Sequence, residues 1–367
     1  MKIIVFSEFS KYLDLSHEEL LHEMVIRGHE VYAIGPETSD EGRLKKLGIG
    51  FLKLSFRQHT VNPIHDLLLL LWLVRIMKKI KPDLYLGYTL KPAVYGSIAA
   101  LLSGVKRRYV MITELSSLFV KKRHGGKTLK STARLLYKAG FYCSTSVFFQ
   151  NRDDRKVMLK LKLLARRKSL VIRGPGVNLD YYQPCPMPRR PIFLFAGSVS
   201  RDKGICEYMQ AAALLKVHNP EARCWIVGAA DPGEESVSEE IMHLAEEGSI
   251  RYFGVAEDIR PYLNDCRFFV FPSYREGIPR SVLEAMAVGR PIITTDAPGC
   301  RETVIDGRNG FLVPVGDDME LFDRMQWLLK HPREAEEMAW ESLLLVQKKY
   351  DMHKVNRSML KKMHLIV

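Results

Sequence analysis

The sequence lacks several features that would restrict its class. Its longest uninterrupted apolar run, residues 67–74, has eight residues, whereas a helix that spans a bilayer needs about 20. The six cysteines are scattered without a C-x-x-C pair, so no disulfide framework or cysteine zinc site is expected. MKIIVFSEFS at the N-terminus has a short apolar run with no cleavage site after it, and we expect a first strand there rather than a signal peptide. These absences indicate a globular protein of the reducing cytosol.

Common cofactor and metal motifs are also missing. The dinucleotide-binding pattern G-x-G-x-x-G does not occur, and neither does Asp-x-Asp, the usual metal-binding signature of metal-dependent sugar transferases. HGGKT (124–128) resembles the end of a phosphate-binding P-loop, but the required glycine is replaced by Lys121. His17 and His22 are five positions apart, which places them roughly 140° apart around a helix and prevents them from sharing a zinc ion. We therefore expect no metal and no bound cofactor.

Acidic residues are scarce in one segment of the chain. The formal net charge is +13, and residues 105–173 contain 19 Lys or Arg against the three acids Glu114, Asp153 and Asp154. This segment alone has a balance of +16, so the remainder is close to −3. A basic excess of this size is typical of proteins that meet nucleic acid, an anionic membrane surface or a polyphosphate substrate. Composition does not choose among the three.

Apolar strand-like runs alternate with helix-like periodicity along almost the whole chain. Such runs include KIIVF, EVYAI, DLYLGYT and RRYVMIT in the first half, and IFLFAGS, ARCWIVG, FFVFPSY and PIITTDA in the second. This alternation predicts parallel sheets with right-handed crossovers, and the proline-rich break near residues 175–191 predicts a linker. We expect an α/β protein of two doubly wound, Rossmann-like domains, residues 1–175 and 176–344, with a helix at about 345–367 packing back on the first. Ligands of such sheets bind beyond the carboxyl ends of the strands, and we expect the two domains to face a cleft.

Residues 276–284, EGIPRSVLE, contain two glutamates eight positions apart. Pro279 suits a first helical turn, so a helix is expected to begin there and to present its free N–H groups and positive end to a phosphate. Gly277 allows the backbone to approach a ligand closely. Taken alone, the pair has a simpler interpretation, in which Glu276 favours the helix N-terminus and Glu284 faces water.

The context of this pair resembles the retaining glycosyltransferases of family 4, which have the GT-B fold. Their signature is E-x7-E, typically followed by AMA-x-G-x-P-x-I-x-T, and SYREGIPRSVLEAMAVGRPIITTDAPGCRETVIDGRNGFLVP (273–314) is similar to it throughout. FAGSVSRDKGI (195–205) resembles a second family element, a strand followed by a basic turn. The family often has GRL where this chain has Gly197, Ser198 and Val199, so one expected arginine is absent. The resemblance then assigns the donor diphosphate to Lys203, with Arg201 assisting.

The resemblance also implies roles for the other donor-site residues. The second glutamate of the family signature, here Glu284, would bind the ribose diol, and the first, here Glu276, would hold hydroxyls of the donor sugar. Lys203 and the helix N-terminus would neutralise the departing diphosphate without a metal ion. The donor-binding set implied in this way further includes Gly197, Val255, Gly277, Ile278, Pro279 and Ser281. Of these, Val255 would lie against the nucleobase.

The first half is similar to the subgroup that builds cell-surface polysaccharides such as O antigens and capsules. YTLKP at the start of residues 88–113 resembles the subgroup's YTIKP, but ITELSSLF (112–119) has Glu114 and Ser116 where glycines are usual. Lys91, Thr113 and Glu114 are our candidates for the acceptor side, although Glu114 has a simpler interpretation as a solvated loop residue. The resemblance implies transfer, with retention, of a sugar to a lipid-diphosphate-linked saccharide in a bacterium. UDP-linked hexose or N-acetylhexosamine is the expected donor, and guanosine is not excluded.

A lipid-linked acceptor lies in a membrane, and an anionic membrane surface would be a partner for the basic segment. We predict that the first domain docks peripherally on the cytoplasmic face of the plasma membrane through basic side chains, among them Lys121, Lys122, Arg123 and Lys127. Each basic residue near anionic lipid is worth about 1 kcal/mol. The stretch LLLLLWLVRIMKKI (67–80) either contributes to docking or forms a buried helix of the first sheet.

Two other classes are alternatives at this point. A nucleotide-sugar 2-epimerase would share the fold and the donor but not the E-x7-E context. A basic nucleic-acid-binding protein would use residues 105–173, which lack repeated aromatics between basic residues and any helix-turn-helix pattern.

Overall fold

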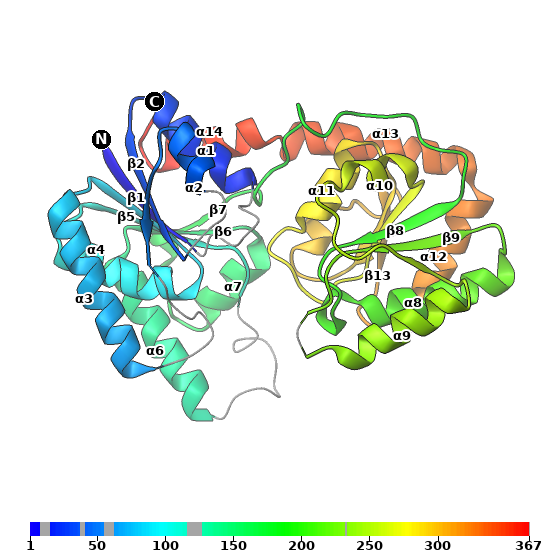
Figure 1. The fold of residues 1–367 in the computed structure, drawn as a ribbon, viewed down its shortest axis with the longest axis horizontal. Coiled ribbons are helices and arrows are strands. Elements are labelled where there is room, and N and C mark those ends of the chain that lie inside the picture. The colour runs from blue at the N-terminus through cyan, green and yellow to red at the C-terminus, as the bar shows by residue number, and fades with distance from the viewer. Residues whose placement is uncertain (8–14, 37–40, 55–61, 116–126, 232, 367) are drawn as a thin grey trace. The chain divides into compact units, whose positions relative to one another are not determined.

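The computed structural model describes residues 1–7, 15–36, 41–54, 62–115, 127–231 and 233–366, with the backbone alone at 15–17 and 127–130. The basic loop that contains Lys121, Lys122 and Arg123, and the HGG of the P-loop-like motif, lie outside the described residues. The contacts divide the chain into two compact units, Met1–Ile172 with Asn356–Val367, and Arg173–Val355. Each unit is built on one parallel sheet flanked by helices (Figure 1). The predicted α/β class with two Rossmann-like sheets is confirmed.

The sheet of the first unit has the strand order β3-β2-β1-β4-β5-β6-β7. Its strands are β1 (Lys2–Phe6), β2 (Glu30–Gly35), β3 (Gly50–Lys53), β4 (Leu84–Tyr88), β5 (Arg107–Ile112), β6 (Ser146–Phe149) and β7 (Ser169–Val171). The chain leaves β1 toward one edge and returns to pair β4 with β1 on its other side, with Ile4 opposite Tyr85. The order reverses at this point, where open α/β sheets bind ligands beyond the strand ends.

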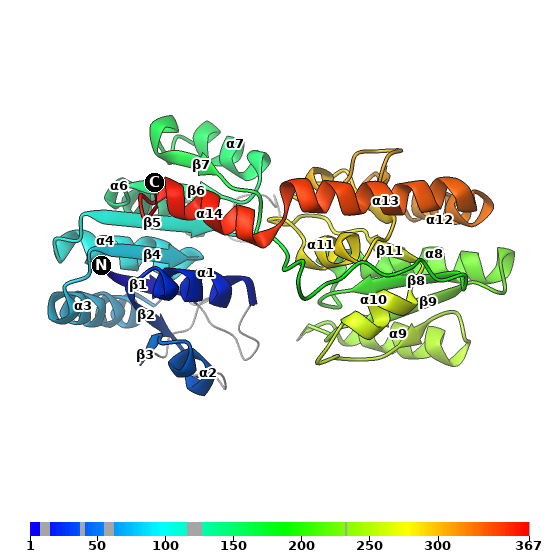
Figure 2. The same cartoon turned by 90° about the horizontal axis from the view of Figure 1, so that it is seen from above.

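Helices cover both faces of this sheet (Figure 2). Their bounds are α1 (Leu15–Ile26), α2 (Glu41–Lys46), α3 (Pro63–Ile80), a π-helical turn (Pro92–Gly96) that leads into α4 (Ser97–Leu102), α6 (Lys127–Cys143), α7 (Arg152–Lys160) and α14 (Met352–Lys362). Leu69 and Leu73 of α3 pack with Ile4 on one face, whereas Met359 of α14 packs with Ile3 on the other. Successive strand residues point to opposite faces, so the two sets of helices cover opposite sides.

The sheet of the second unit has the order β10-β9-β8-β11-β12-β13. Its strands are β8 (Ile192–Ala196), β9 (Arg223–Val227), β10 (Arg251–Tyr252), β11 (Phe268–Phe271), β12 (Ile292–Thr295) and β13 (Gly310–Val313). Its helices are α8 (Ile205–His218), α9 (Glu235–Glu246), α10 (Arg260–Asp265), α11 (Arg280–Ala287), α12 (Asp318–Lys330) and α13 (Pro332–Lys349). β8 and β11 are neighbours, with the rings of Phe193 and Phe268 stacked 4.6 Å apart between them. The order reverses between these two strands.

Candidate active site

The central pair of the candidate site comes from the loops that follow β8 and β11. Lys203 ends a short 3-10 helix (Arg201–Lys203) after β8, and Glu276 lies in the loop between β11 and α11. Parallel neighbouring strands end at the same edge of a sheet, so the two loops meet there. Lys203 Nζ lies 2.5 Å from Glu276 Oε1, and the side chains retain 24% and 12% of their exposure. The sequence-predicted lysine and first glutamate are thus in direct contact.

Two glycines allow these loops to pass closely. Gly204 has φ +75°, and a Cβ there would lie 2.0 Å from the carbonyl oxygen of Pro272. Gly299 has φ +84°, and its Cβ would lie 2.3 Å from the carbonyl oxygen of Glu276. Only glycine adopts this backbone without strain and leaves the space open. The Glu276 backbone N–H also donates to Pro298 O at 3.0 Å, so the main chain that carries the carboxylate is held against residues 298–299.

The Glu276 carboxylate has a second partner, a serine hydroxyl. Ser273 Oγ donates to Glu276 Oε1 at 3.0 Å, and Ser273 itself is fully buried. Cys300 lies below the same loop, and its burial, followed by the nearby Glu276 charge, raises the pKa of the Cys300 thiol to about 12. Cys300 therefore remains a neutral thiol at physiological pH and is a packing residue.

The second glutamate is held inside the unit. Glu284, on α11, is 7% exposed, and its Oε1 accepts hydrogen bonds from Tyr182 Oη at 2.8 Å and Arg280 Nε at 2.8 Å. The interpretation in which Glu284 faces water is therefore wrong. Burial, and after it the Glu284 charge, raises the pKa of Tyr182 well above its ordinary value. Tyr182 therefore keeps its proton and donates a hydrogen bond to the carboxylate.

Helix α11 begins between the two glutamates. Its first residue is Arg280, and Pro279 precedes it with φ −68° and ψ 116°, so the helix starts one residue later than predicted. Gly277, Ile278 and Pro279 are buried, and Ser281 is half-buried in the first turn. The free N–H groups at such a helix start attract anions.

The remaining donor-side candidates are more dispersed. Arg201 Nε lies 3.4 Å from Glu234 Oε2, and its Nη2 donates to Ser236 Oγ at 3.1 Å, so this guanidinium interacts with residues around the start of α9 rather than with Glu276. Gly197 follows β8 and its N–H donates to Val227 O at 3.0 Å. Val255 lies in the loop after β10 and is 57% exposed, with its side chain available for contact.

The acceptor-side candidates lie in the first unit. Lys91 follows β4, is 6% exposed, and its Nζ lies 2.6 Å from Asp66 Oδ1 of α3. Tyr95 Oη donates to the other Asp66 oxygen at 2.9 Å. Thr113 and Glu114 follow the neighbouring strand β5, where Thr113 is half-buried and Glu114 exposed. All three candidates therefore lie near the carboxyl edge of their sheet, with Lys91 already in a buried ion pair.

Sequence reasoning did not single out Ser273, Arg280, Tyr182 or Asp66. Arg280 precedes Glu284 by four positions, the spacing of neighbours on one helix face, so this contact had a local signal. Tyr182 reaches Glu284 from 102 positions away, and Asp66 reaches Lys91 from 25 positions away. No sequence pattern marks those two contacts.

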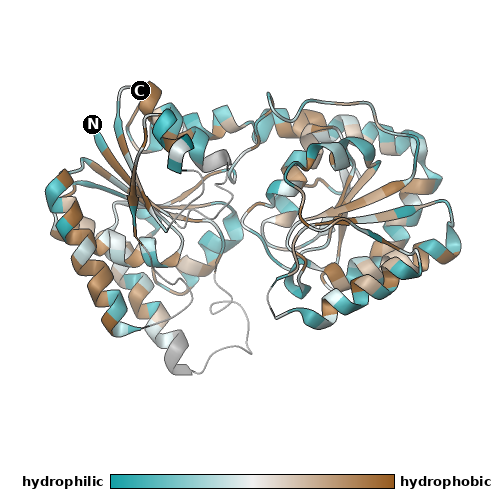
Figure 3. Cartoon of the chain, viewed as in Figure 1, coloured by the Kyte–Doolittle hydropathy of each residue, from teal (hydrophilic) through white to brown (hydrophobic). Residues whose placement is uncertain are grey.

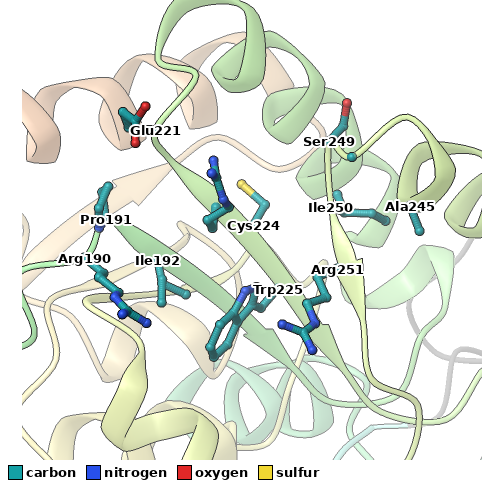
Figure 4. Close-up of a pocket in the computed structure, with 12 residues that line it drawn as sticks. Arg190, Pro191, Ile192, Glu221, Cys224, Trp225, Ala245, Ser249, Ile250 and Arg251 are labelled. Atoms are coloured by element: carbon teal, nitrogen blue, oxygen red, sulfur yellow. The ribbon is translucent and has the colours of Figure 1, made fainter.

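A cavity of about 610 Å³ lies elsewhere on the second unit (Figure 4). It is lined at the amino ends of β8, β9 and β10, and Arg190 and Arg251 stand on either side of Trp225. None of the sequence-predicted site residues lines it. In the described parts of the chain, no three His, Cys, Asp or Glu side chains are grouped to hold a metal ion. Independence from metal remains a prediction.

Two doubly wound parallel-sheet units of this kind are the architecture of the GT-B class. The chain belongs to that class by family as well: residues 4–151 match the family model described as glycosyl transferase 4-like, and residues 190–331 match glycosyl transferases group 1. The predicted resemblance to family 4 and the predicted transferase activity are thereby confirmed.

Two curated relatives are glycosyltransferases, and a solved structure has a similar fold. The chain is 26% identical over 318 residues, 83% of each protein, to N,N'-diacetylbacillosaminyl-diphospho-undecaprenol alpha-1,3-N-acetylgalactosaminyltransferase of Campylobacter jejuni. It is 24% identical over 278 residues, covering 70% of this chain and 69% of the relative, to UDP-Gal:alpha-D-GlcNAc-diphosphoundecaprenol alpha-1,3-galactosyltransferase of Escherichia coli. The fold is similar to that of Anabaena HepE in complex with UDP-glucose, with TM-score 0.81, 19% identity and full coverage of both chains.

Proposed function

We propose that the protein is a retaining glycosyltransferase that moves a hexose or an N-acetylhexosamine from a UDP-linked donor to a lipid-diphosphate-linked saccharide in the synthesis of a bacterial surface polysaccharide. The names of the Campylobacter and Escherichia relatives support the acceptor class, since both specify a saccharide on diphosphoundecaprenol. One relative is named for N-acetylgalactosamine and the other for galactose, so the proposal keeps both kinds of sugar.

The observation that carries the proposal is the contact between Lys203 and Glu276 where the strand order of the second sheet reverses. Lys203 would turn its ammonium group to the donor diphosphate and neutralise the charge that grows as the nucleotide leaves. The start of α11, next to Glu276 along the chain, offers further N–H donors. A cation next to a carboxylate suits a ligand with phosphates at one end and sugar hydroxyls at the other.

The two carboxylates would bind the sugar and the ribose of the donor. Glu276 would accept hydrogen bonds from hydroxyls of the transferred sugar, and Glu284 would accept both ribose hydroxyls, because an ionised carboxylate makes strong paired bonds to a diol. Tyr182 and Arg280 donate to Glu284 and would hold its carboxylate in one orientation before the donor arrives. A carboxylate that is already oriented loses less conformational entropy when the donor binds.

The transfer step balances without a protein base. The bond between the sugar C1 and the diphosphate oxygen breaks, a bond forms from the acceptor hydroxyl oxygen to C1 on the same face, and the acceptor proton passes to the departing phosphate. Configuration at C1 is retained. The electrostatic work is assigned to Lys203 and the helix N-terminus, so no divalent metal is required.

The acceptor is assigned to the first unit. Thr113 and Glu114 would face it at the carboxyl edge of the sheet, whereas Lys91 would position the loop after β4 through its buried pair with Asp66. Among the described helices, none combines the length and apolar character needed to cross a bilayer. We propose that the protein reaches a membrane-held acceptor by peripheral association with the cytoplasmic face of the plasma membrane.

A direct test supplies the purified protein with a panel of UDP- and GDP-sugars and a short-chain lipid-diphosphate saccharide, followed by mass spectrometry. The proposal predicts an acceptor heavier by one hexosyl or N-acetylhexosaminyl residue with a UDP donor. A donor that is epimerised without transfer would instead indicate the epimerase class. Sugar transfer only to water would contradict the assigned acceptor.

A further inference from the structure

Helix α3 has apolar side chains on two opposite faces. Its inner face packs Leu69, Leu73 and Met77 into the core against the sheet. An ordinary helix at a protein surface is polar on its outer side. The outer face of α3 instead carries Ile64, Leu67, Leu68 and Leu71, which are 72%, 55%, 60% and 57% exposed.

These four residues follow the helical spacing i, i+3, i+4 and i+7, so they form one continuous stripe rather than scattered contacts. Helix α4 packs beside α3, and Ser103 Oγ at its end donates to Val74 O at 3.4 Å. This contact brings the exposed Leu101 and Leu102 close to α3. We call the six residues Ile64, Leu67, Leu68, Leu71, Leu101 and Leu102 the α3–α4 apolar face. Figure 3 shows the hydrophobic colour along α3.

The exposed Asp, Glu, Lys and Arg side chains of the two helices have one sign. Arg75, Lys78 and Lys79 are exposed and continue along α3 beyond the stripe, and Lys106 is exposed shortly after α4. The two helices are described in full, and their single acidic residue, Asp66, is buried in its pair with Lys91. A contiguous exposed apolar patch marks an interaction site, and a basic border favours an anionic partner.

An anionic bilayer fits both features better than a second copy of the chain. Two copies facing each other through this surface would bring their basic borders together, and neither helix has an exposed acid to compensate. A bilayer accepts the aliphatic side chains at its acyl boundary and the basic groups at its headgroups, the arrangement of an interfacial amphipathic helix. We propose that the α3–α4 apolar face inserts shallowly into an anionic membrane surface. This inference rests on the proposed function only for its purpose, which is access to a lipid-linked acceptor.

Basic residues in residues 105–173 contribute less to docking than their number indicates. Lys168 Nζ donates to the carbonyl oxygens of Tyr142 and Ser144 at 2.8 and 2.7 Å, which stabilises the end of α6. Arg108 donates to the carbonyl oxygen of Cys143, and Arg155 Nε donates to Ser169 Oγ at 2.8 Å. Part of the basic excess therefore has a structural role within the unit, whereas the stripe of α3 stays exposed among the described residues of that unit.

The test compares sedimentation of the full chain with vesicles of phosphatidylcholine alone and with vesicles that also contain phosphatidylglycerol. Wild type should bind the anionic vesicles and be released by 1 M salt, where the Debye length falls to about 3 Å. Leu68→Gln and Leu71→Gln should each weaken binding about tenfold, since each removes a side chain from the acyl boundary. The matched control is Met242→Gln on α9 of the second unit, which is 55% exposed against 60% and 57% for the two leucines and should bind as wild type.

A second pair of variants separates charge from insertion. The triple change Arg75→Glu, Lys78→Glu and Lys79→Glu should abolish binding, whereas Lys348→Glu on α13, also exposed, should have no effect. Unchanged vesicle binding by the leucine variants, or no binding by wild type, overturns the proposal. A wild-type dimer in analytical ultracentrifugation that the leucine variants convert to monomer assigns the face to self-association and also overturns it.

Failure of the docking proposal and failure of the proposed function give different results. Transfer to the short-chain acceptor in solution needs no vesicle, so the leucine variants should retain wild-type turnover there. If they do and vesicle binding is absent, the function stands and the docking surface is wrong. If vesicle binding follows the predictions but no nucleotide sugar supports transfer to the short-chain acceptor, the docking surface stands and the proposed function is wrong.

Discussion

Lys203 and Glu276 are 73 positions apart in the chain, yet Lys203 Nζ lies 2.5 Å from Glu276 Oε1. The contact forms because β8 and β11, which precede these residues, are adjacent parallel strands. In the free protein each charge is balanced by the other, and the pair is only partly exposed. A donor that brings both phosphates and hydroxyls can replace this contact with one partner for each charge.

Lys203→Ala should reduce turnover about a hundredfold, comparable to the loss of one donor that stabilises the transition state. The apparent affinity for the acceptor should change little, because the acceptor is assigned to the first unit and Lys203 lies in the second. Steady-state kinetics with varied donor and acceptor measure both effects. Arg201→Ala is the matched control: its guanidinium interacts with Glu234 and Ser236, and its loss should reduce turnover far less. Equal losses in the two variants would contradict the assignment of the phosphate to Lys203.

Glu284→Ala should weaken UDP binding about tenfold or more, because it removes charge-assisted hydrogen bonds worth roughly 1.5–3 kcal/mol. Calorimetric titration with UDP measures the change, and the melting temperature checks that the buried site still folds. Tyr182→Phe keeps the carboxylate but removes one of its donors, so it should weaken binding only severalfold. UDP affinity that is the same in wild type and Glu284→Ala would exclude a ribose contact for Glu284.

Chelation provides a test that requires no variant. If Lys203 and the start of α11 neutralise the leaving diphosphate, turnover should survive dialysis against EDTA and should not rise when magnesium or manganese is restored. A strict requirement for a divalent ion would show that another charge performs this role. The assay needs a donor that is itself free of bound metal.

The buried thiols of the second unit predict loss of stability in base. Burial raises the pKa of Cys224, Cys266 and Cys300 from 9.0 to about 12. Between these values the unfolded chain has lost protons that the folded chain keeps, so the free energy of unfolding falls as pH rises above about 9. Each thiol should contribute about 1 kcal/mol of the loss between pH 9 and pH 10.

Urea unfolding at both pH values measures this loss. Cys300→Ala is the informative variant, since it lacks one of the linked protons and should lose about 1 kcal/mol less over the same interval. A variant that follows the wild-type pH profile would show that the Cys300 thiol is not protonated differently in the folded and unfolded states. Below pH 8 the contribution of the thiols to pH dependence should be absent.

The family resemblance singled out Lys203 and Glu276 in the sequence, and the strand pattern explains how they come into contact. Alternating runs indicate which strands are parallel, and a lysine and a glutamate placed just after two such strands can meet once those strands are neighbours. The contact of Tyr182 with Glu284 could not be predicted in this way, because it depends on how the segment before β8 packs against α11. The ion pair of Lys91 with Asp66 depends likewise on the packing of α3.

The apolar stretch of α3 illustrates a different limit. Residues 67–74 have no polar position that would distinguish a buried face from an exposed one, so hydrophobicity alone predicted a core helix as readily as a surface one. Packing resolves the ambiguity residue by residue: Leu69 and Leu73 are buried, whereas Leu68 and Leu71 are exposed. Only the position of the helix against the sheet contains this information.

The anomeric configuration of the product is the most direct test of the proposed transfer with retention. Transfer from an α-linked UDP-sugar to the short-chain lipid-diphosphate saccharide, followed by proton NMR of the purified product, reports the new linkage without any assumption about individual residues. Same-face transfer gives an α linkage, because the acceptor hydroxyl attacks C1 from the side on which the diphosphate departs toward Lys203. A β linkage would contradict retention and the proposed same-face transfer.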